Sequence, residues 1–222
     1  MRVFEIIGPS MIGPSSSHTA GACRLGWAAR ALLDEPPENA RIELHGSFWA
    51  TGDGHGTKEA LIAGLLGLAP DDERLIQSPE LASAEGLAIH FGEVDLGPQA
   101  HPNTVRIHLK GSSRQLSLTG ASVGGGSVCI QEVDGLPVEI RGTLETLVLW
   151  HQDTPGFLAR ITAVLACVQI NVASIRTSRL EHGENAITAI EVDGSLPDEV
   201  SALLRKTPAI VRFTRLPVLP GS

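Results

Sequence analysis

The sequence has no run of basic residues longer than Arg205-Lys206, and its 222 residues carry a formal net charge of −8. Nucleic-acid binding depends on neutralising backbone phosphates with Lys and Arg, so no nucleic-acid partner is expected. Long hydrophobic runs are also missing. The start, MRVFEIIGPSM, is too short for a secretory core and far below the ~20 apolar residues of a membrane span. We therefore expect a cytoplasmic protein without a membrane partner.

Cysteine is scarce, with only Cys23, Cys129 and Cys167 present. An odd number at wide separations is neither a disulfide framework nor a CxxC metal clip, so we expect no metal site in this chain. Cys167 lies in the apolar run ITAVLACV and is predicted to be a small buried side chain. Any metal or iron–sulfur chemistry would have to take its ligands from another chain.

The hydrophobic content of 42% is ordinary for a globular protein, and the pattern changes near DGLPVEIRGTLE, which predicts a boundary between domains at 1–140 and 143–222. Helical and extended patterns alternate in the first part, which predicts an α/β or α+β domain with a mixed sheet. The expected elements are helices at 19–35 and 57–67, strands at 40–48 and 103–110, and two strands within 114–133 around the glycines at 124–126.

Residues 143–222 follow the order strand, helix, strand, strand, helix, strand, which predicts a ferredoxin-like βαββαβ domain. Apolar residues recur at helical spacing from Phe157 to Val168, and Thr154 is a candidate cap for this helix. The turn between the second and third strands is expected in EHGEN, with Gly183.

The phrases HQDTPGFLARI and INVASI resemble the ACT domain, an amino-acid-sensing module of metabolic enzymes. In that family a small ligand often binds at the turn between the first strand and the first helix, between paired modules. The resemblance therefore implies a regulatory ligand at Asp153, Gly156 and Asn171, and self-association through this domain. The residues alone leave another interpretation open, in which Gly156 serves only the turn and Asn171 only helps to end a helix.

Three serines and a histidine, SSSHT, stand where the first helix is predicted to begin, so Ser16 or Ser17 is its expected cap. A helix N-terminus exposes unpaired N–H groups and a partial positive field, which holds a carboxylate without a lysine. The same field lowers the pKa of His18 and favours a neutral imidazole that accepts a proton. The pattern fits an acid substrate anchored beside a general base. An ordinary cap, with His18 on the surface, explains it as well.

A second histidine, His55, lies among glycines in HGSFWATGDGHGT, just before another predicted helix. Glycine lets the backbone approach a ligand closely, so two histidines at helix starts within 40 residues indicate a shared pocket. The run lacks the Lys-Ser/Thr ending of a phosphate-binding loop and the spacing of a dinucleotide fingerprint. A third phrase, HPNT, offers Asn103 before a strand, where turn formation explains it at least as well as binding does.

In this order, IGPSMIGPSSSHTAGACRLG, HGSFWATGDGHGT, HPNT and SVGGGSV resemble the β portion of iron–sulfur-dependent L-serine dehydratases over about residues 3–140. The resemblance implies the β chain of a two-chain enzyme that deaminates L-serine to pyruvate and ammonia in amino-acid catabolism. It implies a [4Fe-4S] cluster ligated by a partner α chain, whose unligated iron takes the serine hydroxyl, and it implies no PLP. One departure is Lys58, where an acidic residue is expected after GHGT.

The resemblance also assigns roles to residues. His18 is the first choice for the base that removes the Cα proton, or for a group in its proton path, and His55 supports it. The substrate carboxylate or the cluster-bound atoms would be held by Ser15, Ser16, Ser17, Thr19 and Asn103. A rival function of another class is a non-catalytic amino-acid- or anion-binding regulator, because an ACT sensor and a helix-end anion site would suffice for sensing.

Overall fold

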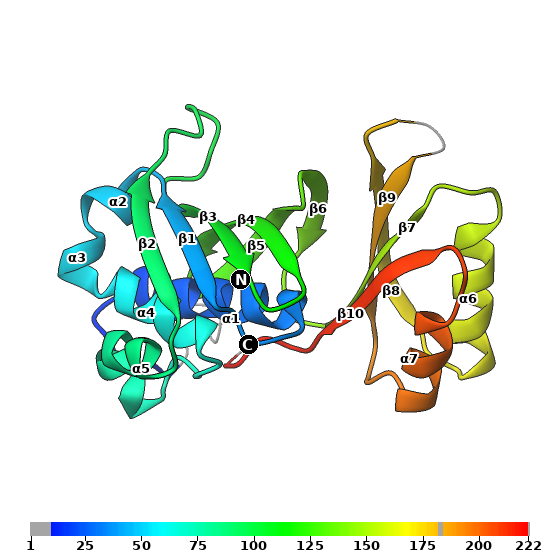
Figure 1. The fold of residues 1–222 in the computed structure, drawn as a ribbon, viewed down its shortest axis with the longest axis horizontal. Coiled ribbons are helices and arrows are strands. Elements are labelled where there is room, and N and C mark those ends of the chain that lie inside the picture. Colours follow the sequence, from blue (N-terminus) through cyan, green and yellow to red (C-terminus); the bar gives the residue numbers. More distant parts are fainter. Residues whose placement is uncertain (1–9, 182–183, 222) are drawn as a thin grey trace.

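The computed structural model describes residues 10–181 and 184–221. Two β-sheets form its framework, one of six strands and one of four (Figure 1). Most of the first Ile-Gly-Pro-Ser phrase, and Gly183 of the predicted turn, lie outside the described residues. No helix within the described ranges is both long and apolar enough to cross a membrane.

The larger sheet is mixed, as the sequence predicts. Its strands are β1 (Asn39–Leu44), β2 (Ala88–Glu93), β3 (Thr104–Lys110), β4 (Gln115–Gly124), β5 (Ser127–Val133) and β6 (Leu136–Ile140). Their order is β2-β1-β3-β4-β5-β6, and only β1 and β2 pair in parallel. In β3, Val105, Ile107 and Leu109 are buried, while His108 on the opposite face is partly exposed, so the predicted alternation is confirmed.

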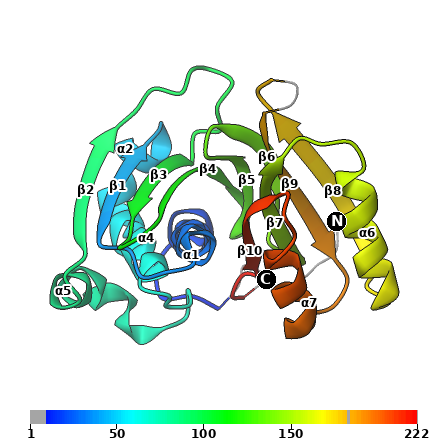
Figure 2. The same cartoon turned by 45° about the vertical axis from the view of Figure 1, so that its right-hand side comes forward.

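The helices of this half begin with one continuous helical segment, in which a π-helical turn runs directly into an α-helix. The helices are η2 (Ser16–Gly21), α1 (Ala22–Leu33), α2 (Ser47–Ala50), α3 (Gly52–His55), α4 (Thr57–Leu65), η3 (Glu73–Gln77) and α5 (Ser78–Ala84). The apolar face of α1, including Leu25 and Leu32, is fully buried. Figure 2 shows α1 nearly end-on, enclosed by the curved larger sheet.

The predicted strand at 40–48 is too long, because β1 ends at Leu44 and α2 follows at Ser47. The cause is a turn at Gly46, whose φ of +56° is one that glycine adopts readily. The Gly46 backbone also lies against the backbone of Pro102. The Ser47 N–H then donates to the Pro102 carbonyl at 2.8 Å. A contact between segments more than 50 residues apart thus converts the expected end of a strand into a helix.

The smaller sheet has the predicted ferredoxin-like βαββαβ order. Its elements are β7 (Glu145–Gln152), α6 (Phe157–Cys167), β8 (Val172–Arg179), β9 (Asn185–Val192), α7 (Asp198–Arg205) and β10 (Ile210–Leu216). All strand pairs are antiparallel in the order β10-β7-β9-β8, and both helices cover one face (Figure 1).

Two details of α6 differ from the predictions. The residue before the helix is Gly156 with a φ of +77°, and no side chain caps the end, so the expected Thr154 cap is wrong. Cys167 is exposed rather than buried. It lies two residues beyond Leu165, and two residues are about 200° of helical rotation, which places it opposite the buried face.

The hydrophobic core continues from one sheet to the other. Val148, Ile187 and Leu216 of the smaller sheet pack in the same cluster as α1 and the larger sheet. A second cluster lies between the smaller sheet and its helices α6 and α7. The predicted domain boundary falls between the end of β6 and the start of β7. The division into two domains stays a prediction, since one hydrophobic cluster contains residues from both sides of this boundary.

Helices α1 and α4 are in close contact at two glycines. A Cβ added to Gly64 would overlap the Cys23 carbonyl, and one added to Gly26 would overlap the Leu61 carbonyl. The backbones of the two helices therefore touch where any side chain would separate them.

We expect Gly64→Ala to lower the free energy of unfolding by about 1–3 kcal/mol, because the new methyl group forces the two backbones apart. Urea unfolding of the chain measures the change. Gly54→Ala is the matched control, since an added Cβ there meets nothing within 4 Å. Equal stability of the two variants would contradict the close contact.

Candidate functional site

Two histidines from separate helix ends lie side by side, next to Ser47 and Thr51 at the short helix α2 (Ser47–Ala50). His18 comes from the first turn of η2, and His55 is the last residue of α3. Their ring centroids are 4.9 Å apart with an angle of 36° between the planes. The sequence predicted a shared pocket for these two residues, and the structure brings them together. We call them the histidine pair.

The residue that caps the first helix is Ser15, not Ser16 or Ser17 as predicted. Ser15 has extended backbone angles, and its Oγ accepts the His18 N–H at 3.2 Å. The π-helical turn starts the helix with wider hydrogen-bonded rings, which moves the cap one residue earlier. Ser16 and Ser17 are half-buried, and their hydroxyls have no hydrogen bond to other described residues.

His18 is buried and enclosed by hydroxyl groups. Its Nε2 lies 3.3 Å from Ser47 Oγ and 3.2 Å from Thr51 Oγ1, and its Nδ1 lies 3.5 Å from Ser15 Oγ. Burial lowers the pKa of His18 below its ordinary value, with a smaller contribution from His55, while a hydrogen bond to the Ser47 backbone opposes the shift. The predicted direction is confirmed, and burial is the main cause of the shift.

Ser47 and Thr51 are the site residues that the sequence analysis missed. They lie four residues apart, so one helical turn places both on the same side, and the Thr51 hydroxyl also donates to the Ser47 carbonyl at 2.9 Å. If Ser47 had been assigned to a helix, the four-residue spacing would have indicated that Ser47 and Thr51 lie on the same side of it. The strand predicted at 40–48 concealed it.

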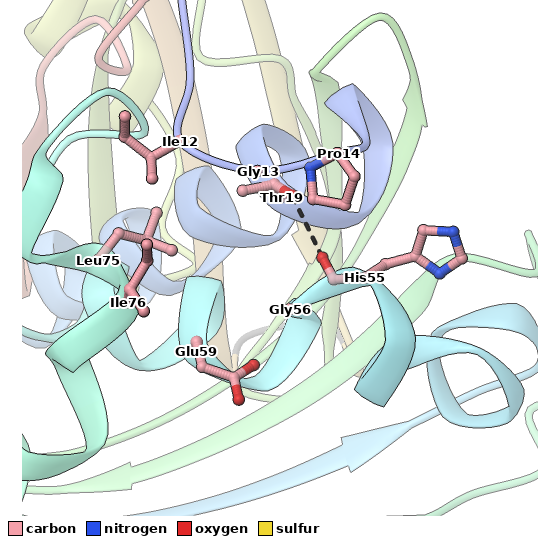
Figure 3. A pocket seen from close by; sticks show the side chains of 9 residues that line it. All are labelled: Ile12, Gly13, Pro14, Thr19, His55, Gly56, Glu59, Leu75 and Ile76. Carbon is pink, nitrogen blue, oxygen red and sulfur yellow. Dashed lines mark hydrogen bonds between the residues drawn. The ribbon is translucent and has the colours of Figure 1, made fainter.

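His55 is half-buried and has a defined tautomer. Its Nδ1 lies 2.8 Å from the Thr51 carbonyl oxygen, which only accepts hydrogen bonds, so Nδ1 carries the proton. In the neutral form of this imidazole the lone pair is on Nε2, which has no hydrogen-bond partner among the residues described. Figure 3 shows the imidazole pointing away from the cavity behind it.

That cavity measures about 310 Å³ and is mostly apolar, with Ile12, Leu75 and Ile76 in its wall. Thr19 also lines the cavity, and its hydroxyl donates to the His55 carbonyl at 3.3 Å (Figure 3). Thr19 is almost fully buried, so the structure places it as a link between η2 and α3. Its predicted role with substrate stays a prediction.

Asn103 lies in the loop before β3, next to the start of α2. Its carbonyl accepts the Ser122 N–H at 3.0 Å, while its side-chain oxygen is buried without a partner among the described residues. Lys58, the departure from the expected pattern, forms an ion pair with Asp53 at 2.7 Å and lies 5.6 Å from the Trp49 ring centre. The unexpected charge is therefore paired with a carboxylate of α3.

The three cysteines do not fit an iron–sulfur cluster. Cys23 is buried and donates its S–H to the Leu68 carbonyl at 3.4 Å, and burial raises the pKa of its thiol to about 12. Burial also raises the pKa of Cys129, and Cys167 is exposed on α6. Cluster iron is bound by thiolates, which these environments disfavour for Cys23 and Cys129. Within the described ranges, no group of three or more His, Cys, Asp or Glu residues is arranged to hold a metal ion.

The regulatory residues predicted in the smaller sheet lie at opposite ends of it. Asp153 forms an ion pair with Arg179 at the end of β8, beside Gly156 at the start of α6. Asn171 precedes the start of β8 and donates to Asp193 at 2.7 Å. One chain alone therefore does not bring Asn171 to the other two.

The sequence matches two family models, one described as serine dehydratase beta chain over residues 3–133 and one as ACT domain over residues 146–209. A D-3-phosphoglycerate dehydrogenase from Bacillus subtilis is 25% identical over 195 residues. The match covers 86% of this chain but only 36% of the dehydrogenase.

Two relatives match over nearly their whole length. A probable L-serine dehydratase, beta chain, from Bacillus subtilis is 41% identical, over 96% of this chain and 97% of the relative. The L-serine dehydratase, beta chain, from Peptoniphilus asaccharolyticus is 36% identical, over 95% and 94%. The chain, with its histidine pair at two helix ends and an ACT domain in its C-terminal part, belongs to the serine dehydratase beta chain family.

Proposed function

We propose that this chain is one part of a cytoplasmic enzyme that deaminates L-serine to pyruvate and ammonia, completed by an α chain that ligates a [4Fe-4S] cluster. The names of the full-length relatives support the reaction and the need for a partner. The cysteines of this chain do not fit the cluster, which is consistent with ligands on that partner. The observation that carries the proposal is the histidine pair, with a neutral buried His18 beside an accepting Nε2 of His55.

The reaction removes a proton from Cα and hydroxide from Cβ of serine, leaving an aminoacrylate that rearranges and hydrolyses to pyruvate and ammonia. A cluster on the partner would supply the Lewis acid for the departing hydroxyl. In this chain, the hydroxyls of Ser16 and Ser17 and the helix N-terminus suit the substrate carboxylate.

The base must present a free lone pair to the substrate. His55 does so through Nε2, whereas both ring nitrogens of His18 already lie beside hydroxyl groups. We therefore assign proton removal to His55 and the positioning of Thr51 and α3 to His18. This reverses the order expected from the sequence, in which His18 came first, and the expected order remains the alternative in the test below.

We expect His55→Gln to lower kcat for pyruvate formation by roughly 10²–10⁴-fold in the complex with the α chain, since the general base is lost. His18→Gln should lower kcat by a smaller factor. Activity assays with L-serine under anaerobic conditions measure both, and His90→Gln, an exposed histidine on β2, is the control. Near-normal turnover in His55→Gln would overturn the assignment, and a larger loss in His18→Gln would restore the original order.

Burial of histidine also predicts a pH dependence of stability. Burial lowers the pKa values of His18 and His151 below the ordinary 6.5. Below that pH the unfolded chain binds protons that the folded chain does not, so the free energy of unfolding falls as the pH falls. Urea unfolding of the isolated chain between pH 7 and 5.5 should show this decrease, and His18→Gln should reduce its slope. An unchanged slope would contradict a buried, neutral His18.

Amino-acid sensing is a second candidate function, favoured by the match to D-3-phosphoglycerate dehydrogenase. Most of this chain resembles about a third of that protein, whose name denotes a different reaction. A segment that occurs with two different activities is suited to a task common to both, such as binding a regulatory ligand. We infer that the smaller sheet performs it, with Asp153, Gly156 and Asn171 as ligand-binding residues.

Self-association would complete such a site. The strand β8 is an edge of its sheet, most of its residues are exposed, and Ile175 keeps 40% of its surface accessible. If β8 pairs antiparallel with β8 of a second copy, Asn171 of one copy approaches the Arg179 end of the other, where Asp153 lies.

We expect Ile175→Lys to convert a dimer of the isolated chain into a monomer and to abolish the heat of binding of millimolar L-serine. A charge on an edge strand opposes strand pairing. Sedimentation velocity and calorimetry measure the two effects. Asn171→Ala should keep the dimer but lose the heat, and Leu203→Lys, on the exposed side of α7, should change neither. Undiminished binding by a monomeric Ile175→Lys would rule out a shared site.

A further inference from the structure

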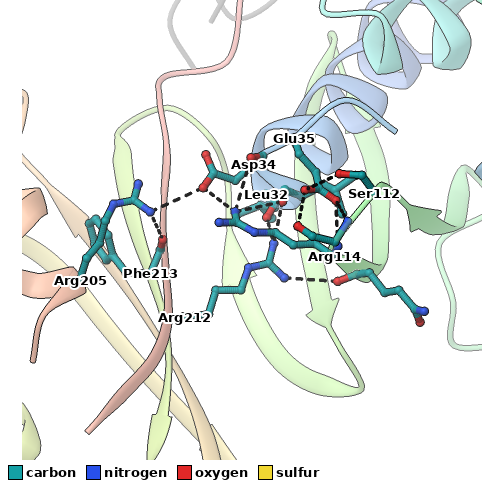
Figure 4. A network of polar contacts seen from close by, with 11 residues as sticks. Leu32, Asp34, Glu35, Ser112, Arg114, Arg205, Arg212 and Phe213 are labelled. Atoms are coloured by element: carbon teal, nitrogen blue, oxygen red, sulfur yellow. Dashed lines mark hydrogen bonds and ion pairs between the residues drawn. The ribbon is translucent and has the colours of Figure 1, made fainter. Parts of the chain in front are cut away.

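The C-terminal end of α1 is held by a residue of the smaller sheet. Arg212 of β10 donates to the carbonyls of Leu32 and Leu33, the latter at 3.2 Å, and to the Gln115 carbonyl at 3.3 Å (Figure 4). The last carbonyls of a helix have no partners within it, and a cation there is favourable. Arg212 therefore caps α1 from a strand nearly 180 residues further along the chain.

Arg212 is itself held in place by its own sheet. Its guanidinium lies 4.3 Å from the ring centre of Trp150 on β7. The Trp150 indole donates to Asp134 at 2.8 Å, in the turn between β5 and β6. The guanidinium is thus fixed by stacking as well as by hydrogen bonds, an arrangement that a lysine does not reproduce.

The segment after β10 contacts the same helix a second time. The buried Arg24, at the start of α1, donates to the Gly126 carbonyl and to the carbonyls of Pro220, at 2.9 Å, and Gly221. β10 and the residues that follow it therefore hold α1 near both of its ends.

His18 lies at the other end of this helical segment. Eighteen helical residues, from Ser16 to Leu33, span about 27 Å. Along its side the segment meets α4 at Gly26 and Gly64, which have no side chains to interlock along the axis. The polar contacts at the two ends of α1 therefore add to the axial position that its buried apolar face sets. His18 moves with it, while Ser47 is anchored separately to the Pro102 loop.

We propose that Arg212 is a positioning residue for the histidine pair: by holding the end of α1 it sets the distance of His18 from Ser47 and Thr51. The influence on catalysis rests on the proposed function, whereas the effect on His18 does not.

The strand that carries Arg212, β10, pairs with β7, the strand that leads into the predicted ligand turn at Asp153. The Gln152 N–H, next to Asp153, donates to the Ala209 carbonyl at 3.0 Å, just before β10 begins. Arg212 pairs with Trp150 two residues earlier on β7. The ligand turn and Arg212 are therefore joined by one pair of neighbouring strands, β7 and β10.

The test compares Arg212→Gln, which removes the cap, with Arg212→Lys, which keeps the charge. The first readout is the ring chemical shifts of His18 in the isolated, folded chain. We expect Arg212→Gln to change them and Arg212→Lys to change them less. In the complex with the α chain, Arg212→Gln should lower kcat about tenfold to hundredfold with little change in KM, because the histidines are displaced rather than lost.

Two controls separate positioning from general destabilisation. Leu204→Ala opens a cavity beneath α7 and should lower stability without moving the His18 signals. Arg141→Gln removes an exposed arginine that pairs with Glu139 and should change neither readout. Unchanged His18 shifts in Arg212→Gln, or the same shifts in Leu204→Ala, would overturn the proposal. A wild-type complex that forms no pyruvate would overturn the proposed function instead, and the shifts would still decide the role of Arg212.

Discussion

The backbone contact between α1 and α4 is the constraint on which the site depends. Gly26 and Gly64 let the two helices approach until carbonyl and Cα atoms touch. His18 is the third residue of the helical segment that ends in α1, and α4 begins two residues after His55. The separation of the two imidazoles therefore depends on how these helices pack, together with the contacts at the ends of α1, and no direct hydrogen bond between the rings is needed to maintain it.

The two histidines, although neighbours, have different environments and therefore differ in which ring nitrogens are available as hydrogen-bond acceptors. His18 is enclosed by hydroxyl groups and kept neutral by burial. His55 donates a hydrogen bond from Nδ1–H to the Thr51 carbonyl, and its Nε2 has no partner among the described residues. The Thr51 residue contacts both, through its hydroxyl and its carbonyl. This short helical turn makes the two side chains one structural unit, although they are 37 residues apart in the sequence.

The sequence was informative wherever local pattern decides structure. The apolar face of α1, the alternation in β3 and the βαββαβ order are all set by periodicity, and the structure has them. The errors arose where distant contacts decide: Gly46 turns because it meets Pro102, and Ser47 joins the site as a result. Cys167 is a different case, since its helical angle from Leu165 already excluded it from the core. No local sequence pattern could have indicated that Arg212 donates hydrogen bonds to the C-terminal carbonyls of α1.

The carbonyl partners of Arg24 have a consequence for how the chain acquires its structure. Two of them, at Pro220 and Gly221, lie 196 and 197 residues after it. During synthesis the helix that carries His18 emerges early with a guanidinium destined for burial, and these acceptors emerge late. Burying a charge without acceptors is costly, so the N-terminal half cannot reach its final packing before the C-terminal segment has been made.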